Sequence, residues 1–217
     1  TNYITYDLNR PLHVFDADKV AGNLRVHRAM GGESFPALDD KTYTLDHGMI
    51  VISDDNGVES LAGIMGGADT GVTEETTNVF VESALWNPVQ IALAGRALRI
   101  HSDARQRFER GIDTDFVTTG LQIAVRMIVD HAGGEASKMA IAGATPDTSR
   151  AYRFDPKAVT KIVGMDIPVK EQRQTLDRLG FRLDDGMAHV PAWRSDIQGE
   201  ADLVEEVARV ASLSKLK

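Results

Sequence analysis

Four carboxylates near the end of the sequence have the residue types and the spacing of a site for a hard cation. Asp202, Glu205 and Glu206 are spaced i, i+3 and i+4, so a helix would place them on one face, and Asp196 lies in the preceding loop. Oxygen-only ligands suit Mg²⁺ or Ca²⁺ and not zinc. Acidic residues at a helix start also complement the helix dipole. The pattern therefore leaves two interpretations, a metal site and an ordinary helix N-terminus.

Two further residues could bind a ligand or transfer a proton. His13 follows Pro11 in a segment predicted to be a loop after a strand, where a polar side chain can be presented to a ligand. The alternative is a surface or capping histidine. Glu82 lies among apolar residues in a predicted strand. If Glu82 faces inward it needs a partner, because an unpaired buried carboxylate is costly; if the strand alternates, Glu82 faces solvent.

Two other segments carry weaker signals. The glycine-rich residues 61–69 lack the Lys-Ser/Thr ending of a phosphate loop, but their small side chains and free N–H groups suit close approach by a substrate. The alternative is a tight turn after a strand. The basic residues between 96 and 110 could touch a phosphate backbone, although their counts favour a solvated helix face that Asp103 and Glu109 balance in part.

The elements that must position these residues change in character along the chain. Turn residues separate short β-prone runs at 3–8, 24–29, 41–45, 49–53, 61–65 and 79–86. Helices are expected at 87–98 and 114–132, followed by a strand at 136–142. Beyond a small, polar linker at 143–149, strands are expected at 152–154, 181–183 and 188–191, and helices at 156–163, 169–179 and 200–213. Residues 184–186 have the composition of a hairpin turn.

This alternation predicts an α+β protein with two domains, a larger β-rich domain with packed helices at 1–148 and a small α+β domain at 149–217. The 217 residues include no cysteine, which excludes disulfides and thiolate chemistry and fits a cytoplasmic protein. No apolar run is long enough to span a membrane. The formal charge of −8 disfavours a broad hold on nucleic acid, so RNA contacts should be local. The start at Thr1, with neither Met nor signal sequence, suggests an excised or processed fragment.

Seven motifs occur in an order that resembles one known family. They are residues 1–3 (TNY), 10–16 (RPLHVFD), 61–67 (LAGIMGG), 81–84 (VESA), 107–113 (RFERGID), 191–196 (PAWRSD) and 202–209 (DLVEEVAR). Together they resemble the β subunits of bacterial phenylalanyl-tRNA synthetase, over nearly the whole chain. The resemblance implies most of the tRNA-editing domain at 1–148 and the small domain that follows it, without the aminoacylation core of the α subunit.

The resemblance also implies residue roles. Family members attach phenylalanine to its tRNA using ATP, and the editing domain hydrolyses tyrosine wrongly attached to that tRNA. Glu82 matches the glutamate that meets the tyrosine hydroxyl, and His13 the histidine near the ester. Thr1 and Asn2 match polar residues beside this histidine. The small residues of the family's pocket wall are matched by Ala62, Gly63, Ser102 and Ala104. Better-known members carry Thr at the position of Ser102.

Partners and cofactors follow from the same resemblance. Asp196, Asp202, Glu205 and Glu206 match the family's Mg²⁺ ligands, which are shared with the α subunit of an α2β2 heterotetramer. ATP would be used by the whole enzyme and not bound by this chain, and aminoacylated tRNA would be the substrate. The competing hypothesis is a noncatalytic module that docks the α subunit or binds nucleic acid. Nucleic-acid binding by the second domain is its weaker branch, because the final helix is acidic and a basic stripe is absent from the sequence.

Overall fold

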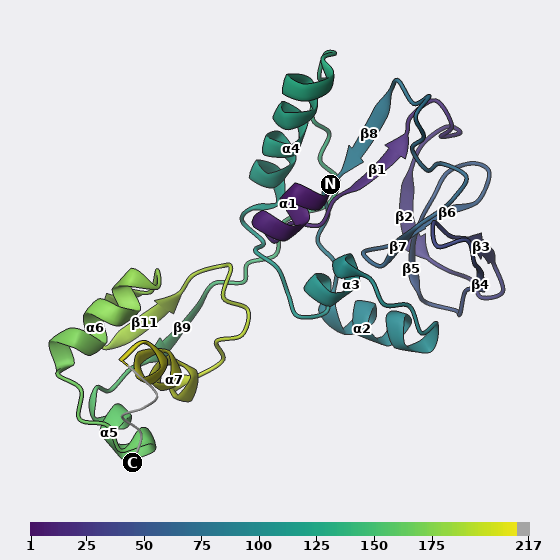
Figure 1. Cartoon of the computed structure of the whole chain (residues 1–217). Coiled ribbons are helices and arrows are strands. Elements are labelled where there is room, and N and C mark those ends of the chain that lie inside the picture. Colours follow the sequence, from purple (N-terminus) through teal and green to yellow (C-terminus); the bar gives the residue numbers. More distant parts are fainter. Residues whose placement is uncertain (212–217) are drawn as a thin grey trace. The chain divides into compact units, whose positions relative to one another are not determined.

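The structure is a computed structural model of the chain, and it describes residues 1–211 of the 217. Its fold is α+β, as predicted. In chain order the described elements are α1 Asn2–Asp7, β1 His13–Asp16, β2 Arg25–Arg28, β3 Ser34–Pro36, β4 Thr42–Thr44, β5 Ile50–Ser53, β6 Val58–Leu61, β7 Met65–Gly66, β8 Val79–Glu82, α2 Pro88–Ala97, α3 Asp103–Phe108, α4 Val117–Ala132, β9 Arg150–Arg153, α5 Lys157–Val163, α6 Val169–Arg178, β10 Arg182–Asp184, β11 Met187–Val190 and α7 Glu200–Ala211 (Figure 1).

The chain divides into two compact units, Thr1–Thr145 and Pro146–Lys217. This division falls inside the linker predicted at 143–149. Each unit has a hydrophobic core of its own, built around Phe35 and Leu61 in the first and around Phe181 and Leu203 in the second. None of the described helices is long and apolar enough to cross a membrane.

The first unit is built from antiparallel strands with helices packed beside them. Its larger sheet has the strand order β2-β5-β6-β7, and two ribbons, β1-β8 and β3-β4, accompany it. Helix α2 begins as predicted at Asn87-Pro88, because the Asn87 side chain accepts hydrogen bonds from the backbone N–H groups of Val89 and Gln90. The ribbon β1-β8 matters most for function, since it carries both His13 and Glu82.

The start of the chain differs from the prediction. The run at 3–8, expected to be a strand, is the helix α1, and His13 begins the strand β1 instead of lying in a loop. The contacts of α1 explain the difference: the Thr5 carbonyl accepts a hydrogen bond from Arg107 at 3.1 Å, and the Tyr6 hydroxyl donates to Asp103 at 2.7 Å. Both partners belong to α3, a helix that the sequence did not reveal, so tertiary contacts override the β propensity of this run.

Two other predicted elements are wrong, and one runs beyond the described residues. Residues 136–142 form no strand; they are exposed coil, because no described strand pairs with them. The run at 61–65 is the turn between β6 and β7, with Gly63 at a φ of +67°. The predicted final helix extended to residue 213, and its last two residues lie outside the described part of the chain.

The second unit follows its prediction closely. The strands β10, β11 and β9 form an antiparallel sheet in that order, and the helices α5, α6 and α7 bury one face each in the core of the unit. Asp185 and Gly186 form the tight turn between β10 and β11, with φ values of +42° and +73°. Positive φ at both central residues is the geometry that matches the twist of a hairpin, and it explains the Asp-Gly pair.

We expect Gly186→Ala to destabilise the second unit by about 1 kcal/mol, since a Cβ at positive φ is strained. The added Cβ itself would meet nothing within 4 Å, so the cost is conformational. Urea denaturation measures the change. Gly186→Asn is the matched control, because asparagine tolerates this region and should restore much of the loss. Equal losses in both variants would contradict the backbone explanation.

Candidate functional site

His13 and Glu82 lie directly opposite each other on two paired strands. The antiparallel register of β1 and β8 pairs His13 with Glu82 and Phe15 with Phe80. Opposite residues in an antiparallel pair project from the same face with Cβ atoms about 5 Å apart. The ring contacts agree with this arrangement, since Phe15 packs edge-on against both His13 and Phe80. Two residues 69 positions apart in the sequence therefore share one face of the ribbon.

Glu82 is half-buried, so the alternating, solvent-facing interpretation of its strand is wrong. Burial raises the pKa of Glu82 from 4.5 to about 7, and the nearby charge of Arg10 opposes the rise. The carboxyl group is thus close to half-ionised at neutral pH. A carboxyl group in this condition can accept a proton or hydrogen bond from a ligand hydroxyl and can also return a proton.

His13 has the opposite shift. Burial lowers the pKa of His13 from 6.5 to about 4, so its imidazole is neutral at pH 7. Its Nε2 atom is buried and has no hydrogen-bond partner among the described residues. The ring lies over Gly66 of β7, where an added Cβ would be 2.2 Å from its Cε1 atom. A glycine at this position is therefore what allows the imidazole to lie flat against the strand.

Of the small residues predicted for the wall, Ala62 is linked to this pair through Phe15, which packs against His13. Ala62 is fully buried with Phe15, and Gly63 follows it in the turn between β6 and β7. A Cβ on Gly63 would be 2.5 Å from the indole of Trp86. The same turn is fixed from the other side, because the Ser102 hydroxyl donates to the Ile64 carbonyl at 2.6 Å.

Ser102 and Ala104, also predicted for the wall, differ in their contacts. Besides its bond to the turn, Ser102 caps helix α3 by accepting a hydrogen bond from the Arg105 backbone at 3.1 Å. Ala104 is half-buried and packs against the core of the first unit. Ser102 therefore ties the start of α3 to the glycine turn, whereas Ala104 contributes packing.

Thr1 and Asn2 are not brought to the pair by any described contact. Both are exposed at the start of α1, and the backbone carbonyl of Thr1 accepts only the helical bond from Thr5 at 3.0 Å. Their role beside the ester stays a prediction.

Two residues near the site were not predicted from the sequence. Arg10 is a buried guanidinium behind Glu82, and Trp86 has a buried indole N–H without a partner among the described residues. The Arg-Pro pair three residues before His13 was visible in the sequence. Its burial depends on strand pairing and could not be read from the local pattern.

The carboxylates near the end of the chain are largely neutralised by arginine. Arg194 binds Asp196 through two nitrogens at 2.8 and 2.6 Å and Glu206 through a third at 2.8 Å. Arg209 also binds Glu206, at 2.7 Å. Glu206 is buried, and these charge-assisted bonds hold its pKa below the usual value despite desolvation. The cluster has the form of an ion-pair network centred on one buried carboxylate, Glu206.

The other two carboxylates of the cluster, Asp202 and Glu205, have different surroundings. Asp202 accepts a hydrogen bond from the Gln198 backbone at 2.7 Å, which caps the start of α7, and Glu205 is exposed. Among residues 1–211, no group of three or more acidic or histidine side chains is arranged to hold a metal ion. The arginine-bound carboxylates do not fit a Mg²⁺ site within this chain, so a shared metal site stays a prediction and no step below depends on it.

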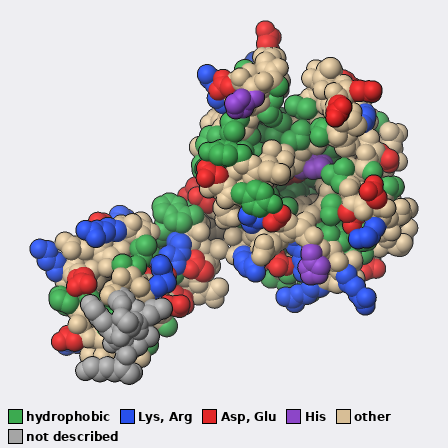
Figure 2. Space-filling model, viewed as in Figure 1, with side chains coloured by type: hydrophobic (Ala, Val, Ile, Leu, Met, Phe, Trp, Pro, Cys, Tyr) green, Lys and Arg blue, Asp and Glu red, His purple; other side chains and the backbone are tan. Residues whose placement is uncertain are grey.

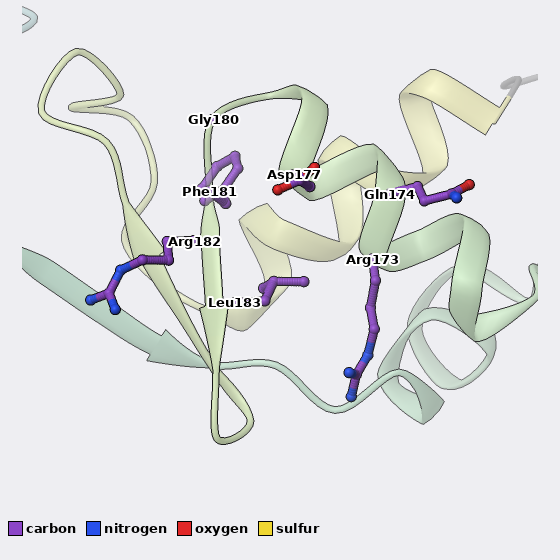
Figure 3. Close-up of a pocket in the computed structure, with 7 residues that line it drawn as sticks. All are labelled: Arg173, Gln174, Asp177, Gly180, Phe181, Arg182 and Leu183. Atoms are coloured by element: carbon purple, nitrogen blue, oxygen red, sulfur yellow. The ribbon is translucent and has the colours of Figure 1, made fainter.

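Neither of two described surface hollows is lined by His13 or Glu82. A hollow of about 490 Å³ in the second unit lies between α6 and β10, but the side chains of Arg173 and Arg182 point away from each other (Figure 3). A hollow of about 940 Å³ in the first unit is mostly apolar and is lined by β2, the start of α4 and residues 139–145. Figure 2 shows hydrophobic side chains gathered around a hollow on the visible face of the first unit.

Comparisons with known proteins agree along the whole chain. The family model described as "B3/4 domain" matches residues 1–133, and the one described as "tRNA synthetase B5 domain" matches residues 152–212. The phenylalanine–tRNA ligase beta subunits of Ruegeria pomeroyi and Cereibacter sphaeroides are 70% and 63% identical to all of this chain. The chain spans 27% of the length of each relative.

A solved structure gives a looser match. It is an N-terminal fragment of the phenylalanyl-tRNA synthetase beta subunit from Pyrococcus horikoshii, 19% identical, with a TM-score of 0.43 over 94% of this chain and 61% of that chain. The family model at 1–133 alone spans more than half of the sequence. The chain, a B3/4 domain followed by a B5 domain, therefore belongs to the family of phenylalanyl-tRNA synthetase beta subunits.

Proposed function

We propose that the first unit is an editing hydrolase that removes tyrosine from the tRNA for phenylalanine. The observation that carries the proposal is the His13–Glu82 pair, which places two groups with opposite pKa shifts on one face of the β1-β8 ribbon. Environments that push two pKa values apart are typical of sites that assign different proton roles to neighbouring groups.

Glu82 would select the substrate by its hydroxyl group. A largely apolar pocket cannot strongly reject an analogue that only adds a hydroxyl, so phenylalanine-specific attachment needs a second, hydrolytic sieve. The tyrosyl hydroxyl can donate a hydrogen bond to the Glu82 carboxylate. A phenyl ring would leave that half-buried carboxylate desolvated and unpaired, which costs free energy.

Hydrolysis itself needs a water positioned at the ester. The water oxygen attacks the carbonyl carbon, the bond to the ribose oxygen breaks, and a proton passes to that oxygen. The neutral His13 offers an unpartnered Nε2 that can hold this water by a hydrogen bond. Because its pKa is near 4, His13 is a weak base at neutral pH, and we assign it a positioning role.

In this proposal the chain works in the cytoplasm as part of a ligase that uses ATP to attach phenylalanine to its tRNA. An α subunit would complete an α2β2 heterotetramer, and the second unit would contribute to that assembly. The identity to full-length phenylalanine–tRNA ligase beta subunits supports this assignment.

The test is deacylation of tyrosyl-tRNA by the full-length protein that carries this chain. We expect Glu82→Ala to lower kcat/KM at least tenfold and to reduce the preference for tyrosine over phenylalanine, because it removes the acceptor for the hydroxyl. His13→Ala should lower kcat for both esters. Glu75→Ala, an exposed residue of the same unit, is the control. Unaltered hydrolysis in both site variants would favour the noncatalytic docking module instead.

A further inference from the structure

Arg10 is the most deeply buried cation near the site, with 1% of its surface exposed. Burying a guanidinium is costly unless its donors are satisfied. Its Nε donates to the Ser83 hydroxyl at 3.1 Å, one terminal nitrogen to the Asp113 carbonyl at 3.4 Å, and the other to the Ala84 carbonyl. All three acceptors are neutral, so hydrogen bonds satisfy this cation without neutralising its charge.

Two of these acceptors belong to the residues that follow Glu82 directly. The Ser83 hydroxyl also donates to the Val117 carbonyl at 2.8 Å. The strand end that carries Glu82 is therefore clamped between Arg10 and the start of α4. The close packing of Gly120 agrees with this, since an added Cβ there would be 2.9 Å from Cγ of Arg10.

Among residues 1–211, the charged and titratable groups that act on Glu82 are His13, opposite it on β1, and Arg10, which itself interacts with Asp113. The α4 group that contacts this strand end is a neutral carbonyl. Arg10 lowers the pKa of Glu82, and Glu82 in turn raises that of Arg10 against the effect of burial. His13 is neutral at pH 7, so Arg10 supplies the positive charge in this group.

We propose that Arg10 is a positioning and specificity-determining residue of the editing site, which fixes the backbone beyond Glu82 and keeps enough of the carboxyl group ionised to select a substrate hydroxyl. The proposal rests on the editing function proposed above. Removing the charge at position 10 would leave a larger fraction of Glu82 protonated at physiological pH, and a protonated carboxyl discriminates less between a tyrosyl and a phenyl ring.

The test compares Arg10→Gln, which removes the charge, with Arg10→Lys, which keeps it. The preference is the ratio of kcat/KM for tyrosyl-tRNA to that for phenylalanyl-tRNA, measured from pH 6 to 9 in the full-length protein. In the wild type we expect it to fall as pH drops through about 7. Arg10→Gln should move this midpoint up by about one pH unit, lowering the preference about threefold at pH 7.5. Arg10→Lys should keep the midpoint, and exposed Arg25→Gln should change nothing.

Nuclear magnetic resonance titration of the Glu82 carboxyl carbon gives a readout that does not depend on hydrolysis. A wild-type midpoint in Arg10→Gln, with only a lower rate, would mean a merely structural role and would overturn the proposal. If Arg10→Gln does not fold at pH 8, recovery of folding at pH 6 or in the double variant with Glu82→Gln supports the proposal. Failure to recover folding in either way overturns the proposal. Full preference for tyrosine in the single variant Glu82→Gln would instead contradict the editing function proposed for Glu82. The titration would then still test whether Arg10 lowers the pKa of the Glu82 carboxyl.

Discussion

Replacing Glu82 with glutamine is expected to raise the free energy of unfolding at pH 8 by up to about 3 kcal/mol and to change it little at pH 4. The reason is the raised pKa, about 7 in the fold against 4.5 for the ordinary group. Between these values the folded state holds a proton that the unfolded state has lost, so stability falls as pH rises from 4.5 to 7. A shift of about 2.5 units corresponds to roughly 3 kcal/mol.

His13 should behave in the opposite way. Its lowered pKa, about 4 against 6.5, means that stability falls as pH drops from 6.5 to 4. Between pH 4.5 and 6.5 Glu82 and His13 change the stability with pH in opposite directions, so the two slopes cancel in the wild type. Replacing either residue leaves the slope that comes from the other. Urea denaturation of Glu82→Gln and His13→Gln over pH 4 to 8 measures both slopes. Exposed Glu75→Gln is the control, and parallel slopes in the two site variants would refute the burial argument.

Replacing Arg194 with methionine should destabilise the second unit by about 3 kcal/mol. Arg194 is the shared partner of Asp196 and buried Glu206, and it also lies over the ring of Phe181. Methionine can fill the same space but leaves Glu206 with only Arg209. Removing one member of a buried ion pair is costly because a charge remains desolvated. Thermal or urea unfolding of the second unit measures the loss.

Arg209→Met is the matched control for this network. Arg209 binds the same Glu206 carboxylate but is itself exposed, so its loss should have a much smaller effect. Arg194→Met combined with Glu206→Leu should recover most of the stability, since the charges that then lose a partner, Asp196 and Arg209, are both exposed. A double variant as unstable as the single one would show that packing on Phe181, and not charge pairing, is the main contribution of Arg194.

Local signals predicted the elements that depend on local chemistry. Helix α2 was marked by Asn87-Pro88, and the β10-β11 turn by Asp185-Gly186. In both cases a side chain or a backbone preference within the element determines where it begins or turns. The second unit, whose elements alternate at short intervals, was therefore predicted almost throughout.

Elements that depend on distant contacts could not be predicted in this way. Residues 3–8 have the composition of a strand, but contacts with α3 make them helical. The coil at 136–142 has the pattern of a strand without a neighbour to pair with. The sequence pattern of one segment cannot show whether it forms a strand, because a strand also needs a neighbouring strand to pair with.

The candidate site shows the same limit. The motifs identified His13 and Glu82 as residues of interest, but only the register shows that they are opposite each other. Asp202, Glu205 and Glu206 met the spacing rule for one helix face, yet Arg194 binds Glu206 as well as Asp196 in the preceding loop. Spacing describes geometry within one element, whereas charge neutralisation depends on which side chains arrive from elsewhere.

The long-range contacts of Arg10 also bear on the order in which the molecule forms. Arg10 bonds to residues 74 and 103 positions further along the chain, so a large loop must close before its clamp exists. Loop-closure entropy must be overcome before such contacts stabilise anything, which places them late in folding. During synthesis the clamp cannot form until the chain has emerged as far as Asp113. The unit therefore acquires the His13–Glu82 pair and its support as it completes its fold, and a partly folded chain lacks the arrangement on which the proposed activity depends.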